Sequence, residues 1–228
     1  MVSRIALYPD PLLAQVLPAS TYWNQIPEAA EWAAQHGHLS SDALAQAVQE
    51  DNLPWDPSVL ALLPIPSVLD MMAKDMAWTE QLGNAVLMQR AEVMDAVQRM
   101  RKRAMDYGYL FPNSYVNVVS NSGYIEILPY VPGVIYVPEY DPAVVFRRPT
   151  FGLAIGGAIR FGRGIAITPF APWGWATAGF VWPSHTVIFD RAPWGRVWGN
   201  REVYRHPYAH PWVRAAGPRV ERHELRRR

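Results

Sequence analysis

Two carboxylates, Glu139 and Asp141, are the residues of this 228-residue chain whose types and spacing best suit catalysis. They stand two positions apart in YVPEYD, a stretch with strand character, so their side chains share one face. A pair of carboxylates beside aromatic rings can act as acid and base in glycoside hydrolysis. Asp141 also precedes Pro142, and an Asp-Pro pair is typical of a helix start, where the carboxylate caps free N–H groups. Catalysis by Glu139 and Asp141 is therefore the alternative interpretation, and capping by Asp141 is the preferred one.

Three histidines, His185, His206 and His210, are the candidate metal ligands. His206 and His210 have the i, i+4 spacing of a zinc-binding helix, but Pro207 and Pro211 prevent that helix from forming. The chain has no cysteine, which excludes disulfides, thiolate metal sites and a cysteine nucleophile. It also has no phosphate-binding or dinucleotide-binding glycine motif and no nucleophile elbow. We therefore expect neither a metal nor a cofactor, and we favour a protein without enzymatic activity.

An aromatic residue followed by Asp-Pro, with or without an intervening proline, occurs three times and marks where structural elements begin. The aspartates are Asp10, Asp56 and Asp141, and apolar residues follow each of them. A carboxylate accepts hydrogen bonds from the free N–H groups of a first helical turn, and proline suits the first helical position. We predict that Asp10, Asp56 and Asp141 are helix caps.

Two regions with different periods follow one another along the chain. Residues 1–110 carry apolar residues at helical spacing behind start signals, which predicts a domain of short helices. Residues 111–150 change to strand character, with a hairpin signal at Asn121-Ser122-Gly123. A further pair of short strands is expected in 132–146, where Pro138 interrupts it.

The remainder divides into a Gly/aromatic-rich segment, 151–204, and an Arg-rich tail, 205–228. Residues 164–184 are 21 positions without a charge, a length that meets the bilayer criterion, but prolines and tryptophans interrupt any helix. We expect strands and loops packed on the sheet or on a partner, with a membrane-inserted hairpin as the alternative. The tail is too polar to fold alone, so we expect it to be extended. The predicted class is α+β: an N-terminal bundle of short helices, a small antiparallel β region and a Gly/Trp/Arg-rich extended C-terminal segment.

The two halves of the chain differ in charge. Residues 1–107 carry 13 acidic and 7 basic side chains, a net charge of −6. Residues 108–228 carry 7 acidic and 14 basic side chains, all of them arginine, a net charge of +7. Six of the ten tryptophans lie between Trp173 and Trp212, and tryptophan and arginine dominate interface energetics. The predicted partner contacts are Trp173, Trp175, Trp182, Trp194, Trp198, Arg191, Arg196 and Arg201.

Four stretches carry a family resemblance: IALYPDPLLAQVLPASTYW, LPWDPSVLALLPIPSVLDMM, MAWTEQLGNAVLMQRAEVMDAVQRMR and IEILPYVPGVIYVPEYDPAVVF. They resemble the bacterial family catalogued as domain of unknown function 3300, over about residues 5–146. Members are typically exported, which implies the bacterial cell envelope, the periplasm or the extracellular space. The chain begins at Met1–Arg4 without the apolar region of a signal peptide. We therefore expect either that a signal has been removed or that this member follows another route.

The expected function combines these observations. We favour a non-enzymatic envelope protein for interaction or assembly, binding a protein partner or its own copies through the Trp/Arg-rich C-terminal half. One alternative is an envelope glycan hydrolase that uses Glu139 and Asp141. Another is a membrane-associated accessory subunit of a larger complex, with residues 164–184 on the lipid and a membrane surface as partner. Nucleic acid is disfavoured as a partner, because an envelope protein rarely meets it.

Overall fold

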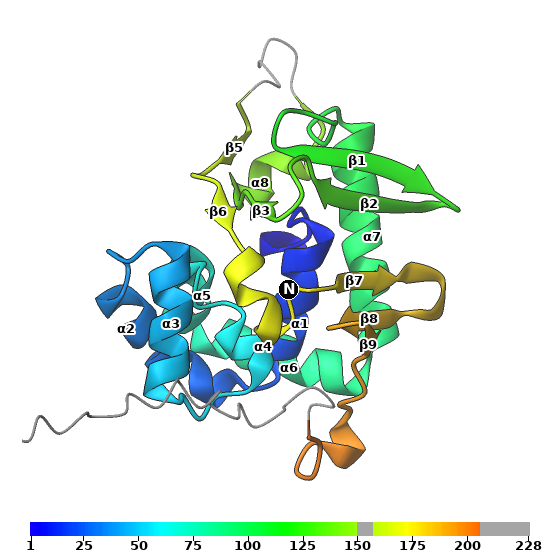
Figure 1. Cartoon of the computed structure of the whole chain (residues 1–228). Coiled ribbons are helices and arrows are strands. Elements are labelled where there is room, and N and C mark those ends of the chain that lie inside the picture. Colours follow the sequence, from blue (N-terminus) through cyan, green and yellow to red (C-terminus); the bar gives the residue numbers. More distant parts are fainter. Residues whose placement is uncertain (150–156, 206–228) are drawn as a thin grey trace, which may run out of the picture.

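The computed structural model describes residues 1–149 and 157–205, which form a helical first half and a β-rich second half (Figure 1). The predicted α+β class is confirmed. The predicted tail beyond Arg205, with His206 and His210, lies outside the described residues. The α-helices are α1 (Asp10–Ser20), α2 (Ile26–Gln35), α3 (Ser41–Asp51), α4 (Pro57–Leu60), α5 (Pro66–Lys74), α6 (Met76–Met88), α7 (Arg90–Asp106) and α8 (Pro142–Val145). The 3-10 helices are η1 (Val2–Arg4), η2 (Trp23–Gln25), η3 (Thr168–Trp173), η4 (Trp182–Ser184) and η5 (Trp198–Asn200).

The strands are short and pair in antiparallel fashion. Within the described residues β1 pairs with β2, β3 with β6, β4 with β5, and β7, β8 and β9 form a three-stranded sheet. Their bounds are β1 (Val116–Asn121), β2 (Tyr124–Pro129), β3 (Val134–Ile135), β4 (Pro138–Tyr140), β5 (Ile159–Phe161), β6 (Ile165–Ala166), β7 (Ala178–Val181), β8 (Thr186–Phe189) and β9 (Ala192–Pro193).

The hairpin predicted at residues 121–123 is present. Ser122 and Gly123 form its two-residue turn with φ of 50° and 85°, the pair of positive values that a type I′ turn requires. The strand pair expected within 132–146 is wrong, because β3 and β4 pair with β6 and β5 from the Gly/aromatic-rich segment instead of with each other.

Side-chain caps begin several helices. The Asp56 carboxylate accepts a hydrogen bond from the Ser58 N–H at 2.9 Å at the start of α4. The Asp141 carboxylate accepts one from the Ala143 N–H at 2.7 Å at the start of α8. Both agree with the capping prediction, and each helix has proline at its first position, where no N–H is needed.

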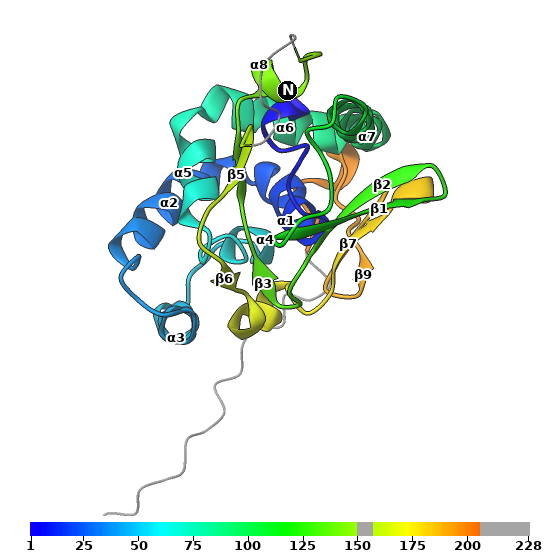
Figure 2. The same ribbon diagram turned by 90° about the horizontal axis from the view of Figure 1, so that it is seen from above.

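Helix α1 is the central element (Figures 1 and 2). It packs against α4 and α6 on one side and against β7 and β8 on the other, and its Leu12, Leu13, Val16 and Leu17 are fully buried. Gly83 lets α6 approach closely, because a Cβ at this position would lie 2.1 Å from the Ser20 carbonyl oxygen. One hydrophobic cluster extends from Val2 to Trp194, so the ranges predicted as separate segments share a core.

The uncharged stretch 164–184 contributes to this core. Ile167, Phe170, Trp175 and Trp182 are buried against the rest of the chain. Among residues 1–149 and 157–205, every helix is too short or too polar to cross a bilayer.

Candidate functional site

The alternative catalytic pair, Glu139 and Asp141, does not share one hollow. Glu139, on β4, is exposed and lines an open hollow of about 390 Å³ together with Arg4, Tyr8 and Ser67. Asp141 is also exposed, and its carboxylate caps α8. Burial, with a smaller contribution from Glu139, raises the pKa of the Tyr8 phenol well above its ordinary range. The hollow thus has a single carboxylate beside a phenol that stays neutral, which does not match the two carboxyl groups of a glycosidase.

His185 is engaged in an ion-pair geometry. Its Nε2 lies 2.8 Å from Asp95 Oδ1 on α7. In the described part of the chain no three His, Cys, Asp or Glu residues are placed to hold a metal ion. His206 and His210 lie outside that part.

Three of the predicted interface tryptophans are inside the molecule. Trp175, Trp182 and Trp194 are 7%, 2% and 1% exposed. The Trp175 indole donates to the Ala61 carbonyl at 2.7 Å, and Trp194 lies under the guanidinium of Arg90, 4.4 Å from the ring centroid. These tryptophans attach the C-terminal half to the helices, so the expectation that they contact a partner does not hold. The sequence indicated that these tryptophans make extensive contacts. The contacts are with the helical half of the same chain.

The other predicted contacts divide between attachment and surface. Arg196 donates to the Thr21 carbonyl and hydroxyl, both at 2.9 Å, and lies over the Tyr22 ring. Trp173 is partly buried beside Phe170. On the surface are Arg191 and a stacked pair, Trp198 with Arg201, which stay predicted contacts.

A buried charge pair, which sequence reasoning missed, lies at the centre of the fold. Arg101 Nη1 lies 2.6 Å from Asp10 Oδ1, and both side chains are buried. The other Asp10 oxygen accepts a hydrogen bond from the Trp182 indole at 3.0 Å. The capping prediction for Asp10 is wrong: Pro9 is the N-cap, Asp10 is the first residue of α1, and its carboxylate is taken by Arg101 and Trp182. We call these three residues the Asp10–Arg101 network.

Carbonyl groups complete the coordination of the guanidinium. Arg101 Nε donates to Ala6 at 2.9 Å, Nη2 to Tyr8 at 3.0 Å, and Nη1 also to Ile125 at 2.8 Å. A buried ion pair is tolerated when its remaining donors are satisfied in this way. No local pattern links positions 10, 101 and 182, so no sequence signal marks the pair.

Two members of this network, Asp10 and Arg101, cover the outer edge of β2 together with Gln98 of α7. The Ile125 N–H donates to Gln98 Oε1 at 2.8 Å, and its carbonyl accepts from Gln98 and Arg101. The Ile127 N–H donates to Asp10 at 3.3 Å. Side chains of α1 and α7 therefore take the place of a neighbouring strand.

The outer edge of β1 is open. The main-chain N–H and C=O groups of Ile125 and Ile127 point away from β1. The same groups of their partners across the hairpin, Ser120 and Val118, therefore point away from β2. Within the described residues the N–H and C=O groups of Val118 and Ser120 have no hydrogen-bond partner. We call these four groups the β1 edge. The hairpin projects beyond α7 in both ribbon views (Figures 1 and 2). The side chain of Val119 is 42% exposed.

The β1 edge lacks the usual protection. Natural edge strands carry charges, prolines or bulges that prevent pairing with other chains. The strands β4 and β5 have such residues, Pro138, Glu139 and Arg160, whereas no charged residue occurs from position 107 to 125. The β1 edge is thus a surface on which another strand can pair.

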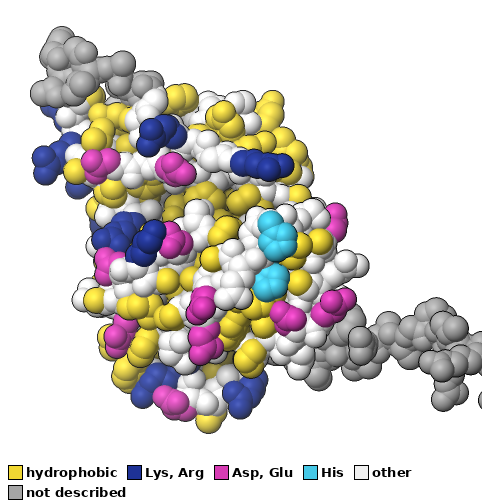
Figure 3. All heavy atoms as spheres, turned by 90° about the vertical axis from the view of Figure 1, so that its left-hand side faces the viewer, with side chains coloured by type: hydrophobic (Ala, Val, Ile, Leu, Met, Phe, Trp, Pro, Cys, Tyr) yellow, Lys and Arg dark blue, Asp and Glu magenta, His cyan; other side chains and the backbone are white. Residues whose placement is uncertain are grey.

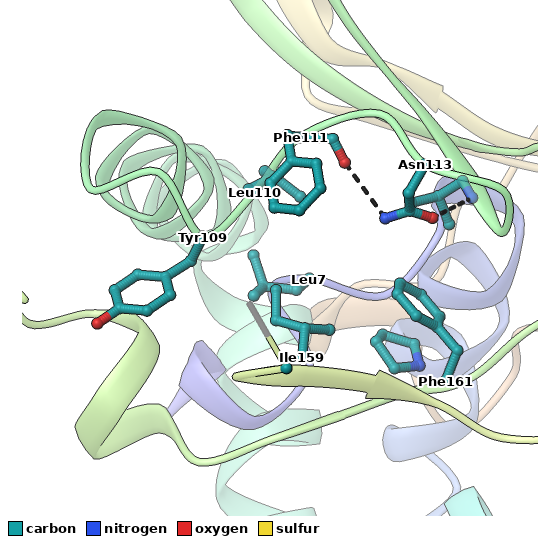
Figure 4. A pocket seen from close by; sticks show the side chains of 10 residues that line it. Leu7, Tyr109, Leu110, Phe111, Asn113, Ile159 and Phe161 are labelled. Atoms are coloured by element: carbon teal, nitrogen blue, oxygen red, sulfur yellow. Dashed lines mark hydrogen bonds between the residues drawn. The ribbon is translucent and has the colours of Figure 1, made fainter. Parts of the chain in front are cut away.

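An aromatic surface with a small pocket adjoins the base of the hairpin. Tyr115 stacks on Phe161 with ring centroids 4.7 Å apart, and Phe111 is 50% exposed. The pocket, about 40 Å³, lies between Phe111 on one side and Ile159 and Phe161 on the other (Figure 4). Its size suits part of one apolar side chain, so it offers an anchor and not a substrate site.

The face that carries α2 and α3 has no extended surface of one charge sign in its described part (Figure 3). There acidic and basic side chains are mixed among apolar ones in the part of the chain drawn in colour (Figure 3). Nucleic-acid binding requires a continuous basic surface, which this face does not have.

Comparisons with known proteins give a family and a relative. The family model described as "Protein of unknown function (DUF3300)" matches residues 1–202. The chain is 33% identical over 177 residues to "Uncharacterized protein YacH" of Escherichia coli (strain K12). The alignment covers 64% of this chain and 28% of YacH, so the chain spans less than a third of that relative's length. No solved structure matches the chain.

Proposed function

The chain belongs to the DUF3300 family, and we propose that it is a non-enzymatic interaction or assembly protein of the bacterial cell envelope that binds through the β1 edge. The observation that carries the proposal is the uncharged β1 edge beside exposed aromatic residues, an edge without a hydrogen-bond partner in the part of the chain that the structure describes. Strand addition to such an edge is a recurring mode of protein recognition, in which main-chain hydrogen bonds provide affinity and side-chain pockets provide specificity.

The proposal moves the interface away from the Trp/Arg-rich half. Trp175, Trp182 and Trp194 are buried inside the chain, whereas β1 offers hydrogen-bonding groups that residues 1–149 and 157–205 leave unused. The pocket beside Phe111 and Phe161 adds a place for an apolar side chain next to the strand. The envelope location is supported by the resemblance to exported family members.

Neither alternative function gains an observation in its favour. Asp141 is a helix cap and Glu139 has no second carboxylate in its hollow, so these two residues do not form the acid–base pair that the glycan hydrolase needs. A membrane-associated subunit would need apolar side chains free for lipid. In residues 164–184, Phe170, Trp175 and Trp182 are buried in the protein instead, and Trp173 is partly buried.

Crosslinking in bacteria that make the tagged chain tests the proposal. We expect crosslinked species heavier than the chain for the wild type, and their loss for Val119→Lys, because a charge on an edge strand opposes pairing. Val181→Lys is the matched control, since Val181 is a similarly exposed valine (46%) on another strand. Equal crosslinking of the two variants would overturn the proposal, and circular dichroism would verify that both are folded.

A further inference from the structure

We infer that the occupant of the β1 edge is the β1 strand of a second copy, antiparallel and related by a twofold axis through Val119. This inference rests on the proposed function and identifies its partner. It would join two hairpins into one four-stranded antiparallel sheet, in the order β2–β1–β1–β2.

The free length of β1 fits a second copy of itself. At its beginning the strand is already closed: the Asn113 N–H donates to the Val116 carbonyl at 2.9 Å, and Asn113 Oδ1 accepts from the Val116 N–H at 3.1 Å. At its end the chain turns at Ser122 and Gly123. The stretch between these limits is 117–121, five residues centred on Val119. An identical antiparallel stretch fills it without overhang, whereas a longer peptide would have to bend away at Asn113.

The hydrogen-bonding groups match in the same register. With the axis at Val119, Val118 faces Ser120 of the second copy, and Ser120 faces Val118 of the second copy. Residues that point outward on both strands form hydrogen-bonded pairs, and each such pair exchanges two bonds. All four groups of the β1 edge thereby gain partners in each copy.

The side chains are compatible with this register as well. Val119 lies next to its own counterpart on the exposed face, and β-branched pairs are favourable across strands. Asn117 and Asn121 face Asn121 and Asn117 of the second copy, so amides meet amides. Glu126 lies on β2, one strand further out, so the two glutamates are separated by three strand spacings, roughly 14 Å.

The contact is small, which sets the expected affinity. Five residues on each side bury less surface than a standard stable interface of about 1,600 Å². We therefore expect a dissociation constant on the order of micromolar or weaker for the purified chain, as for other small interfaces.

Because the chain has no cysteine, a single introduced thiol tests the axis directly. Opposed residues of a non-hydrogen-bonded antiparallel pair have Cα atoms about 4.5 Å apart, within the range of about 4.4–6.8 Å that a disulfide requires. In the full chain under mild oxidation, Val119→Cys is expected to form a covalent dimer severalfold faster than Val181→Cys. Ser120→Cys tests the register, since Ser120 faces Val118 of the second copy and should crosslink more slowly. Equal rates for the variants at positions 119 and 181 would overturn the inference.

A charge pair across the axis provides a second test without oxidation. Val119→Lys and Val119→Glu should each raise the dimer dissociation constant about tenfold or more in sedimentation analysis, because like charges meet at the axis. Mixing the two variants should restore association as a heterodimer, and absence of this recovery would contradict a twofold axis at Val119. If Val119→Lys abolishes crosslinking in bacteria and Val181→Lys does not, but the thiol and charge tests fail, the partner is another protein and not a second copy. Where all of these tests fail, the proposed function fails too.

Discussion

The two strands of one hairpin have opposite surroundings. The outer edge of β2 is closed by side chains, because Gln98, Arg101 and Asp10 bind the main-chain groups of Ile125 and Ile127. The outer edge of β1 faces away from the body, and Val118 and Ser120 have no such partners among the described residues. The same strand pair thus has a structural side and a free side.

The difference shows which polar groups the fold needs and which it leaves for contact. A buried main-chain group without a partner costs free energy, so three side chains, Gln98, Arg101 and Asp10, bond to the main chain of β2. The β1 edge meets water, so leaving it open costs the monomer little. An open edge normally carries a charge or a proline to prevent association, and β1 has neither.

Hydrogen exchange would measure directly how much better the amides of β2 are protected than those of β1. In dilute protein, the amides of Val118 and Ser120 are expected to exchange nearly as fast as in an unstructured peptide. The amides of Ile125 and Ile127 should exchange only through large-scale opening, so the opening free energies should differ by roughly 5 kcal/mol. Similar protection on both strands would contradict the assignment of a closed and an open edge.

Removing the arginine of the Asp10–Arg101 network should be the most destabilising substitution. Arg101→Met leaves the Asp10 carboxylate buried and unpaired, which we expect to lower the free energy of unfolding by about 3–5 kcal/mol. Urea denaturation measures the loss, with Arg99→Met on the exposed face of α7 as the control. Adding Asp10→Asn should recover part of the stability, since the unpaired charge is then removed. A double variant no more stable than the single one would argue against charge burial as the cause.

Shortening Gln98 opens one position of the β2 edge. Gln98→Ala leaves the N–H and C=O groups of Ile125 with one partner fewer each, so we expect a loss of about 1–3 kcal/mol in the free energy of unfolding. Gln81→Ala, on the exposed face of α6, is the matched control. Equal stability of the two variants would show that water replaces Gln98 at this edge.

A proline on the open edge should have the smallest effect on the monomer. Ser120→Pro removes an N–H that points away from β2, and proline is accepted on the outer side of an edge strand. We expect the free energy of unfolding to change by about 0.5 kcal/mol or less, while concentration-dependent association is lost. A large destabilisation in thermal unfolding would mean that this N–H already has a partner within the monomer.

Local features of the fold could be predicted from the sequence because their causes are local. The turn at Ser122 and Gly123 and the caps at Asp56 and Asp141 each depend on residues within a few positions of one another. The α+β class follows from the change of period after residue 110.

Contacts between distant segments could not be predicted in the same way. The partners of β3 and β4 come from residues 159–166, and Asp10 meets Arg101 and Trp182, without any pattern that links these positions. The open edge did leave a signal, the uncharged stretch 107–125, but the longer uncharged stretch 164–184 was the more conspicuous one. Part of that stretch, β6, pairs with β3, and its buried Trp175 and Trp182 bond to Ala61 and Asp10 of the helical half.

The central position of α1 has a consequence for folding during synthesis. Its Asp10 bonds to Trp182, 172 positions further along, and its Gln15 donates to the Gly174 carbonyl, 159 positions further along. A ribosome therefore synthesises α1 before the segments that cover it. Contacts at such separations form slowly, and apolar helices stay uncovered in the meantime. The nascent chain has a long interval in which chaperones can bind it, even though most of its helices have short, local start signals.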